Sequence, residues 1–524
     1  MTLRTTQRQG KASQGTRSRP ATSGRARTGF EFSLLDEPLL LFADNFGDTS
    51  PKRGLATAGP AGLGSSQHKS QILVGLVGTG QTQEKAKDFL NSCKAPIEGG
   101  DNPRQVPPFP GMTRSSAFQT DIEPLESHLG MITNSELQSI VGNSNPAEGF
   151  NDAVKMLTGK VQLLCESDSP PDVILCALPT ELVEFCQEAG KKLVVSSAPK
   201  DKLLSKMVKI EKSSGQRHLL EGLFQDTSQP SDFVGRNLRR ALKARSMKWH
   251  RPIQIGLENS LFSERSQPAA TKAWNFCVAL YYKAGGALPW KAEGLNPETC
   301  FIGISFYRHL LEDSFEMHTS LAQVFTGEGE AFVLRGHKFQ WNQKKTPHLD
   351  EAGAEKLLEL VLSKYNELKG GAPRRIVIHK TSKFWDTELA GFRKGLKAVK
   401  EHDLLSIQQT GVRFFRGGAY PPLRGTLCEV NRKSHFLYTM GYMPDLGTYP
   451  RGYVPEPWEL IDHHGDNTPR KLFKEVMALT KMNYNNADIA DGEPITIKFA
   501  RKVGEILSYI PDNEDPHPSY RFYM

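Results

Sequence analysis

The sequence is poor in the features that mark secreted or membrane-anchored proteins. Its 524 residues contain only seven cysteines, an odd number, and no two of them form a C-x-x-C pair. Such scattered cysteines argue against both a disulfide framework and a zinc site, and they fit a reducing, cytoplasmic compartment. No apolar run is long enough to span a bilayer, so we expect a soluble protein.

The start of the chain has no acidic residue. Residues 1–30 contain seven Arg and Lys side chains, and the whole chain has a formal net charge of +8, which leaves about +1 for the rest. Bulk charge therefore does not indicate nucleic-acid binding; a basic groove would need local clustering. Residues 1–29 are also rich in Thr, Ser, Gln and Gly, so we expect a disordered basic tail. It superficially resembles a transit peptide, but a solvated tail is the simpler interpretation.

The pattern of helices and strands predicts two α/β units. From about residue 148 to 285, apolar strands such as "DVILCALP" alternate with helices, which is typical of a mainly parallel sheet. From Cys300, strand, strand, helix, strand and helix follow, with a late helix, as in a ribonuclease-H-like domain. We expect "EAFVLRGHKFQW" to pair with "CFIGISFYR". The predicted units are residues 1–29 (tail), 30–145 (an N-terminal α/β segment packed on the rest), 146–295 (Rossmann-like) and 296–524 (ribonuclease-H-like).

Two motifs suggest sites but fit a structural role better. "GLVGTGQTQ" supplies Gly78 and Gly80 of a dinucleotide fingerprint, yet Gln83 stands where the third glycine belongs, so a tight strand-to-helix turn is favoured over an NAD site. "IDHHGD" resembles a metal cluster. Because prolines precede it and a helix-start signal follows, we interpret it as a polar loop and His463 and His464 as weak catalytic candidates.

The basic helix "NLRRALKARSMKW" offers a site of another kind. Arg239 and Lys243 are four residues apart and project from one face, Gln254 lies on the next strand, and Lys283 ends a later helix. Converging cations and an amide are what a terminal phosphate requires. A solvated basic helix face, with Lys283 complementing a helix C-terminus, is the alternative.

The ribonuclease-H-like unit lacks the expected metal ligands. Two-metal cleavage of a phosphodiester needs carboxylates at the tips of two strands. Ser305 stands at the first of these positions and Thr381 at the second. A hydroxyl is a poor ligand for a hard cation, and Lys380 and Lys383 would repel a metal further. Asp386 lies one helical turn downstream, too far to be expected to compensate.

Taken together, these motifs resemble Argonaute proteins. The order R-x-x-x-K, Gln, then Lys before Gly-Gly resembles the MID domain, and "CFIGISFYR", "RRIVIHKTSKF", "TKMNYNNAD" and "PITIKFARKVGEIL" resemble a PIWI domain. "PKRGLATAGP" and the C-terminal "YRFYM" resemble the short prokaryotic Argonautes, which consist of MID and PIWI alone. On this resemblance, residues 146–295 are the MID domain and residues 296–524 an inactive PIWI domain.

The resemblance implies a guide-binding protein that does not cut. Arg239, Lys243, Gln254 and Lys283 would hold the 5′-phosphate of a guide, which we expect to be RNA. The carboxylate of Met524 would join Gln254 in holding a structural Mg²⁺ there. Arg501 falls at a third cleavage position beside Ser305 and Thr381, so Lys380, Lys383 and Arg501 would instead contact the guide–target backbone.

The resemblance also implies a partner. Short Argonautes pair with an APAZ-domain protein fused to a TIR, SIR2 or nuclease effector, which is activated when guide RNA pairs with invader single-stranded DNA. We therefore expect a cytoplasmic heterodimer in antiviral defence and plasmid interference, with abortive infection as the outcome. Two alternatives remain open: a guide-dependent nuclease with unusual ligands such as Asp386 and Asp488, and a dinucleotide-binding enzyme.

Overall fold

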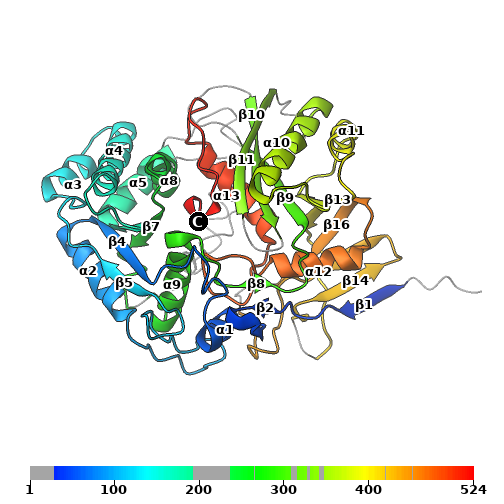
Figure 1. Ribbon diagram of the computed structural model, residues 1–524, viewed down its shortest axis with the longest axis horizontal. Helices are drawn as coiled ribbons and strands as arrows, with labels where there is room; N and C mark the ends of the chain where they lie inside the picture. The colour runs from blue at the N-terminus through cyan, green and yellow to red at the C-terminus, as the bar shows by residue number, and fades with distance from the viewer. Residues whose placement is uncertain are drawn as a thin grey trace, which may run out of the picture.

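The computed structural model describes residues 29–192, 237–264, 266–307, 316–326, 331–340, 347–418, 421–450 and 453–524. These residues form two lobes, each built around one main sheet, and the last residues of the sequence lie between the lobes (Figure 1). The predicted tail falls outside the described residues except for Gly29. No helix among the described residues has the length and apolarity needed to cross a membrane.

The first lobe is built on a four-stranded parallel sheet in the order β5-β4-β6-β7. Its strands are β4 (Gln71–Gly78), β5 (Asp121–Pro124), β6 (Val173–Leu178) and β7 (Ile253–Leu257). Every residue of β6 is buried, as expected for a parallel strand with both faces covered. The helices of this lobe are α2 (Gly80–Ser92), α3 (Asn134–Val141), α4 (Pro146–Cys165), α5 (Thr180–Lys192), α8 (Leu238–Ser246) and α9 (Ala269–Gly285).

This sheet corrects the boundary predicted between residues 145 and 146. β4 and β5 come from the predicted N-terminal segment, yet they hydrogen-bond in one sheet with β6 and β7. β4 is a central strand, so the Rossmann-like domain needs it for its core and begins well before residue 146. The sequence divided the unit because the Pro- and Gly-rich stretch between the first two strands looks like a linker.

The second lobe contains a nine-stranded sheet in the order β1-β14-β15-β16-β13-β12-β9-β10-β11. The part running β11-β10-β9-β12-β13 has the strand order of a ribonuclease-H-like fold. Its strands are β9 (Thr299–Tyr307), β10 (Glu316–Thr326), β11 (Ala331–Gln340), β12 (Arg375–Lys380) and β13 (Glu401–Gln409). The prediction that "EAFVLRGHKFQW" pairs with "CFIGISFYR" is wrong, because β10 lies between these strands and pairs with both.

Helices cover both faces of this core. α10 (Glu351–Lys369) and α11 (Asp386–Gly395) share one hydrophobic cluster with β12, including Leu357, Phe392 and Ile378. α12 (Pro469–Leu479) and α13 (Ile495–Leu507) belong to a larger cluster that continues into the first lobe and contains Leu242, Val278 and Phe499. α13 therefore joins the two lobes through apolar packing.

The far half of the nine-stranded sheet corrects a second prediction. "IDHHGD" is not a loop: it lies in β16 (Trp458–Gly465), which pairs antiparallel with β13. β15 (Ser434–Leu437) and β14 (Thr426–Val430) follow, and β1 (Phe30–Leu34), from the start of the chain, completes the sheet. The polar end of β16 stays in the sheet because His463 has a buried carboxylate partner in Asp403, at 2.9 Å.

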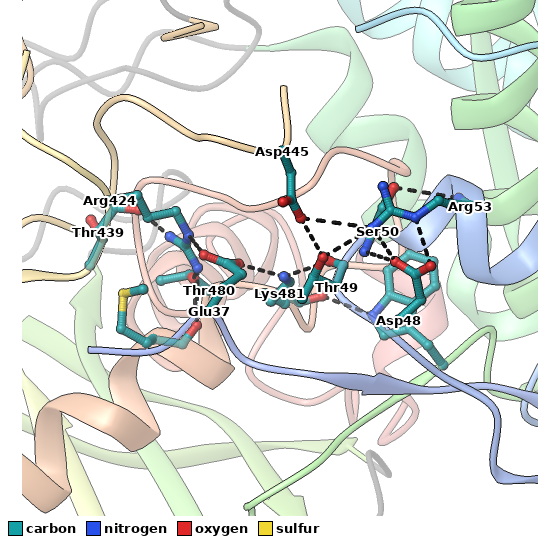
Figure 2. Close-up of polar contacts among 12 residues, drawn as sticks. Glu37, Asp48, Thr49, Ser50, Arg53, Arg424, Thr439, Asp445, Thr480 and Lys481 are labelled. Carbon is teal, nitrogen blue, oxygen red and sulfur yellow. Dashed lines mark hydrogen bonds and ion pairs between the residues drawn. The ribbon is translucent and has the colours of Figure 1, made fainter. Parts of the chain in front are cut away.

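Residues 35–58 tie the two lobes together. β2 (Leu40–Leu41) pairs with β3 (Gly47–Asp48) and with β8 (Lys291–Ala292), and α1 (Pro51–Ala58) follows. Figure 2 shows the polar contacts of this segment: Glu37 accepts hydrogen bonds from Arg424 Nε at 2.7 Å and from Lys481 Nζ at 2.5 Å. The same lysine donates to the Thr49 carbonyl at 2.7 Å. The described residues also include short 3-10 helices (Ala43–Asn45, Met247–Trp249, Tyr520–Phe522).

Candidate nucleic-acid binding site

Three of the four predicted phosphate-binding residues meet where the lobes join. Lys283, in the last turn of α9, places Nζ 2.5 Å from Gln254 Oε1 on β7, 3.2 Å from the Ile253 carbonyl and 3.1 Å from the Met524 backbone oxygen. Lys243 on α8 also donates to the Met524 backbone oxygen. Two lysines, an amide and the last residue of the sequence thus form one polar pocket, called here the lysine pocket.

The lysine pocket is buried and strongly positive. Lys283 is 1% exposed and Lys243 is 8% exposed. Burial, followed by repulsion from Arg239 and Lys502, lowers the pKa of Lys283 to about 7. These two cations therefore disfavour the charged form of Lys283. An anion entering the pocket would relieve that repulsion.

Arg239 is the fourth predicted residue, and it lies at the margin of the pocket. It is half-buried on α8, one turn before Lys243, and its charge lowers the pKa of Lys283. α8 is capped by Asn237, whose side chain accepts the Arg240 N–H at 3.2 Å and whose own N–H donates to Tyr509 Oη at 2.6 Å. This cap fixes the helix that carries both cations.

α13 brings a cation that the sequence did not predict. Lys502 lies on this helix of the second lobe, and its charge acts on Lys283 in the first. Arg240 of α8 pairs with Glu505 of α13 at 2.6 Å, which holds the two helices together. Nothing in the local sequence could identify Lys502, because its proximity depends on how the lobes pack.

The final residues are anchored by buried aromatic side chains and by Arg521, all of which precede Met524 in the sequence. Tyr520, Phe522 and Tyr523 are buried. Arg521 Nη1 donates to the carbonyls of Lys283 and Ala284, each at 3.3 Å, and so satisfies the end of α9. The Met524 backbone oxygen and Gln254 Oε1 converge on one ammonium group. Both are oxygen ligands of the type Mg²⁺ takes, but both accept from Lys283, so they would fit such a cation only if that ammonium turned away.

The three predicted cleavage positions lie on β9, directly after β12, and on α13. β9 and β12 are parallel with Gly303 opposite His379, so Ser305 and Thr381 follow side by side at the same sheet edge. Arg501 on α13 donates to both carboxylate oxygens of Glu493, at 3.2 and 2.8 Å. Two hydroxyls and a paired guanidinium therefore occupy these positions. Among the residues that the structure describes, no group of three or more His, Cys, Asp or Glu side chains could hold a metal.

Lys380 does not have the role predicted for it. Its side chain is 1% exposed, and its Nζ lies 2.5 Å from Glu388 Oε2 on α11, a carboxylate that is itself buried. Because strand residues alternate between faces, Lys380 follows Ile376 and Ile378 toward α10 and α11. This ammonium is enclosed and cannot reach a duplex in this arrangement. Lys383 is exposed in the following loop, and its contact with a nucleic-acid backbone stays a prediction.

The remaining candidate residues are either exposed to solvent or hydrogen-bonded within the sheet. Asp386 is exposed at the start of α11, and Asp488 is exposed in the segment after α12. His463 binds Asp403, which also accepts hydrogen bonds from Arg375 and Asn467. His464 lies 3.0 Å from Asp462 on the same strand. These contacts account for the polar residues of "IDHHGD" as part of the sheet.

The glycine motif forms a strand-to-helix turn. Gly78 ends β4, and Thr79 caps α2 by accepting the Thr82 N–H at 3.3 Å. A Cβ at Gly78 would meet the Ala177 carbonyl oxygen at 2.5 Å, so the close approach of β4 to β6 requires glycine. Gln83, where a fingerprint has its third glycine, is buried and donates to the Gly78 carbonyl at 3.3 Å.

The sequence and the fold were compared with those of known proteins. No protein-family model matches the chain. A curated argonaute protein of Aquifex aeolicus strain VF5 is 20% identical over 336 residues, which cover 62% of this chain and 45% of that protein. Clostridium butyricum Argonaute, solved with a guide DNA and a 19-mer target DNA, gives a TM-score of 0.58 at 13% identity, over 93% of this chain and 54% of its own.

Two further structures agree with this match. Drosophila Piwi gives a TM-score of 0.54 at 13% identity, over 94% of this chain and 56% of its own. The crystal structure of A. aeolicus Argonaute gives 0.51 at 16% identity, over 93% and 54%. The chain thus has the MID–PIWI fold of Argonaute proteins, as the sequence predicted. It spans about half the length of these relatives.

Proposed function

We propose that this chain captures the phosphorylated 5′ end of a nucleic-acid guide in the lysine pocket and presents the guide for pairing with a target. The observation that carries the proposal is the convergence of Lys243, Lys283 and Gln254 at the lobe junction, where burial and neighbouring cations disfavour the charge of Lys283. A terminal phosphate supplies two negative charges and several acceptor oxygens, which match these donors. The guide DNA and target DNA bound by one structural neighbour, Clostridium butyricum Argonaute, support the same proposal.

In this proposal the ribonuclease-H-like lobe holds the guide–target duplex without cutting it. Ser305, Thr381 and Arg501 at the cleavage positions support this, since hydroxyls and a guanidinium cannot hold two divalent metals. The duplex would be recognised by its backbone and helical shape, while base pairing reads the sequence. Lys383 and Arg501 are the proposed backbone contacts that remain after Lys380 is withdrawn. A nuclease using Asp386 and Asp488 is the alternative.

A magnesium ion beside the guide phosphate is part of the proposal. Gln254 Oε1 and the Met524 backbone oxygen would be its protein ligands, and the ion would neutralise phosphate charge. Lys283 would then turn its ammonium from these two oxygens toward the phosphate. The expected signature is tighter binding of 5′-phosphorylated oligonucleotides with Mg²⁺ than with EDTA, and no such difference for 5′-hydroxyl oligonucleotides.

The biological setting proposed is a guide RNA and single-stranded invader DNA, with an effector protein of the APAZ type switched on by pairing. This part rests on the resemblance to short prokaryotic Argonautes. It places any enzymatic activity in the partner, whether a TIR, SIR2 or nuclease module. It also predicts a cytoplasmic complex that protects a population by abortive infection.

Nucleic acid that copurifies with the protein tests guide capture. The chain and its Lys243→Ala variant are expressed in parallel, and bound nucleic acid is extracted, end-labelled and sequenced. We expect short strands with 5′-phosphates from the unaltered chain and about tenfold less from the variant, as loss of one charged hydrogen bond implies. Equal yields, or strands with 5′-hydroxyl ends, would contradict the proposal. Lys272→Ala, at the other end of α9, is the matched control.

A further inference from the structure

β1 leaves a free edge at one end of the nine-stranded sheet. In the described part of the chain it pairs only with β14, and Figure 1 shows it at the outer end of the sheet. Asn431 N–H donates to the Gly29 carbonyl, and Leu35 N–H donates to the Gly425 carbonyl. Odd-numbered residues therefore carry the bonds to β14, so the N–H and C=O groups of residues 30, 32 and 34 point outward.

The side chains of this edge strand are apolar on one face and exposed. Phe30 is 59%, Phe32 57% and Leu34 52% exposed, and alternation puts all three on the same face. Phe32 meets the ring of Phe414 edge-on at 5.7 Å, and Phe414 in turn meets Phe436 at 5.7 Å. An aromatic layer thus runs across the sheet and stops at β1, where one more strand would continue it.

The opposite face of the same edge carries negative charge. Glu31 of β1 lies directly across from Glu429 of β14, and neither carboxylate has an ion-pair partner among the described residues. Arg470 contacts the same face of β1 by donating to Ser33 Oγ at 2.8 Å. Burial lowers the pKa of His435, although the charge of Glu429 opposes this shift. Like charges opposite each other destabilise a strand pair unless a cation joins them.

We infer that β1 is a docking edge for an extended segment of a partner protein that pairs antiparallel with it. That segment is apolar at the positions beside Phe30, Phe32 and Leu34 and basic at the positions beside Glu31. Main-chain hydrogen bonds give affinity and the alternate side chains give specificity, as in other β-strand additions. The inference does not depend on guide capture, because it involves a different edge of the molecule.

Two other occupants fit the edge less well. A second copy paired about Phe32 would set Glu31 opposite Ser33 of the partner strand, leaving the acidic pair without a cation. The chain's own residues 1–28 are basic but contain only two large apolar residues, Met1 and Leu3. They could meet the carboxylates but not continue the aromatic layer. The charge on one face and the apolar layer on the other together favour a foreign strand with both features.

A designed peptide tests the inference. The probe is an acetylated, amidated heptapeptide with Val at odd and Lys at even positions, and the control replaces each Lys by Glu. We expect the Lys peptide to bind the full chain and to slow hydrogen exchange of segment 29–36. Glu31→Lys should weaken the Lys peptide and strengthen the Glu peptide, each by roughly fivefold. Phe32→Pro removes an outward N–H but no bond to β14, so it should abolish binding while the fold persists.

Three results would overturn the inference. One is peptide binding that neither Glu31→Lys nor Phe32→Pro changes, or that slows hydrogen exchange in segments other than 29–36. Another is a dimer of the free chain that Phe32→Pro dissociates, which would make a second copy the occupant. The last is protection of segment 29–36 in the free chain that disappears when residues 1–28 are removed, which would assign the edge to the chain's own start.

Discussion

Lys283 and Gln254 face each other across the ends of α9 and β7, with Nζ and Oε1 2.5 Å apart. The amide holds an ammonium whose charge is disfavoured by burial and by Arg239 and Lys502. A bound phosphate would stabilise the charged form of this lysine, because its oxygens would replace the hydrogen bonds with water that burial removed. The properties of this pair lead to the first prediction.

Guide capture should weaken as pH rises through neutrality. The pKa of Lys283 in the free pocket is about 7, below its ordinary value, so the group loses its proton above that pH. A bound phosphate favours the protonated form, and binding at pH 8.5 must therefore take up a proton. We expect affinity for a 5′-phosphorylated oligonucleotide to be roughly tenfold lower at pH 8.5 than at pH 6.5 by fluorescence anisotropy.

Lys283→Met is the control for this pH dependence. The variant has no proton to exchange, so its weaker binding should be nearly constant over the same range. An affinity of the unaltered chain that stays flat or rises with pH would show that Lys283 does not titrate against the phosphate.

Lys380 should matter for stability and not for binding. Removing its ammonium leaves Glu388 buried and unpaired, so Lys380→Ala should lower the free energy of unfolding by about 3–5 kcal/mol in urea titrations. Lys380→Met with Glu388→Gln removes both charges and keeps an acceptor for the Leu349 N–H, so it should recover most of the loss. If the single variant instead kept full stability and lost duplex affinity, the original prediction for Lys380 would return.

Glu37 should hold the N-terminal segment against the second lobe. It is shared by Arg424 and Lys481, and although burial opposes its ionisation, these cations lower its pKa. Glu37→Ala leaves two buried cations without their common carboxylate, so we expect a loss of roughly 3 kcal/mol. Glu84→Ala, which removes an exposed pair with Lys87, should change stability by less than about 0.5 kcal/mol. Comparable losses in both variants would contradict a clamping role.

Strand scission should be absent. With a 5′-phosphorylated guide, a complementary target and either Mg²⁺ or Mn²⁺, we expect uncut target in a denaturing gel, because Ser305, Thr381 and Arg501 supply no metal-bridging carboxylate. Guide-dependent product that Asp386→Asn abolished would establish the alternative of unusual ligands. The same substitution serves as the control for contaminating nucleases, which it would not affect.

Three of the predicted phosphate-binding residues lie together in the structure, and local sequence patterns had indicated them. Arg239 and Lys243 share a helix face, and Lys283 ends a helix before two glycines, so their spacing was informative. The local sequence does not indicate Lys502, because only the packing of α13 on α8 brings it near Lys283. Lys380 was misjudged for a related reason: which face of β12 it occupies depends on the helices that cover that face.

Domain limits were harder to predict than elements. β4 was recognised as a strand, but that it pairs with β6 across nearly a hundred residues cannot be read from either segment. Likewise, the local sequence does not indicate β10. The polar end of β16 favours a loop in the sequence, but a buried carboxylate on β13 stabilises it as a strand. Long-range partners decided each of these cases.

The most direct test of the account is the ratio of affinities for otherwise identical 5′-phosphorylated and 5′-hydroxyl oligonucleotides. For the unaltered chain at pH 6.5 we predict a ratio of roughly a hundred, because two charged hydrogen bonds distinguish the ligands. For the Lys243→Ala, Lys283→Met double variant the ratio should fall close to one, while Lys272→Ala keeps it. An unchanged ratio in the double variant would contradict the assignment of the lysine pocket as the guide-end site.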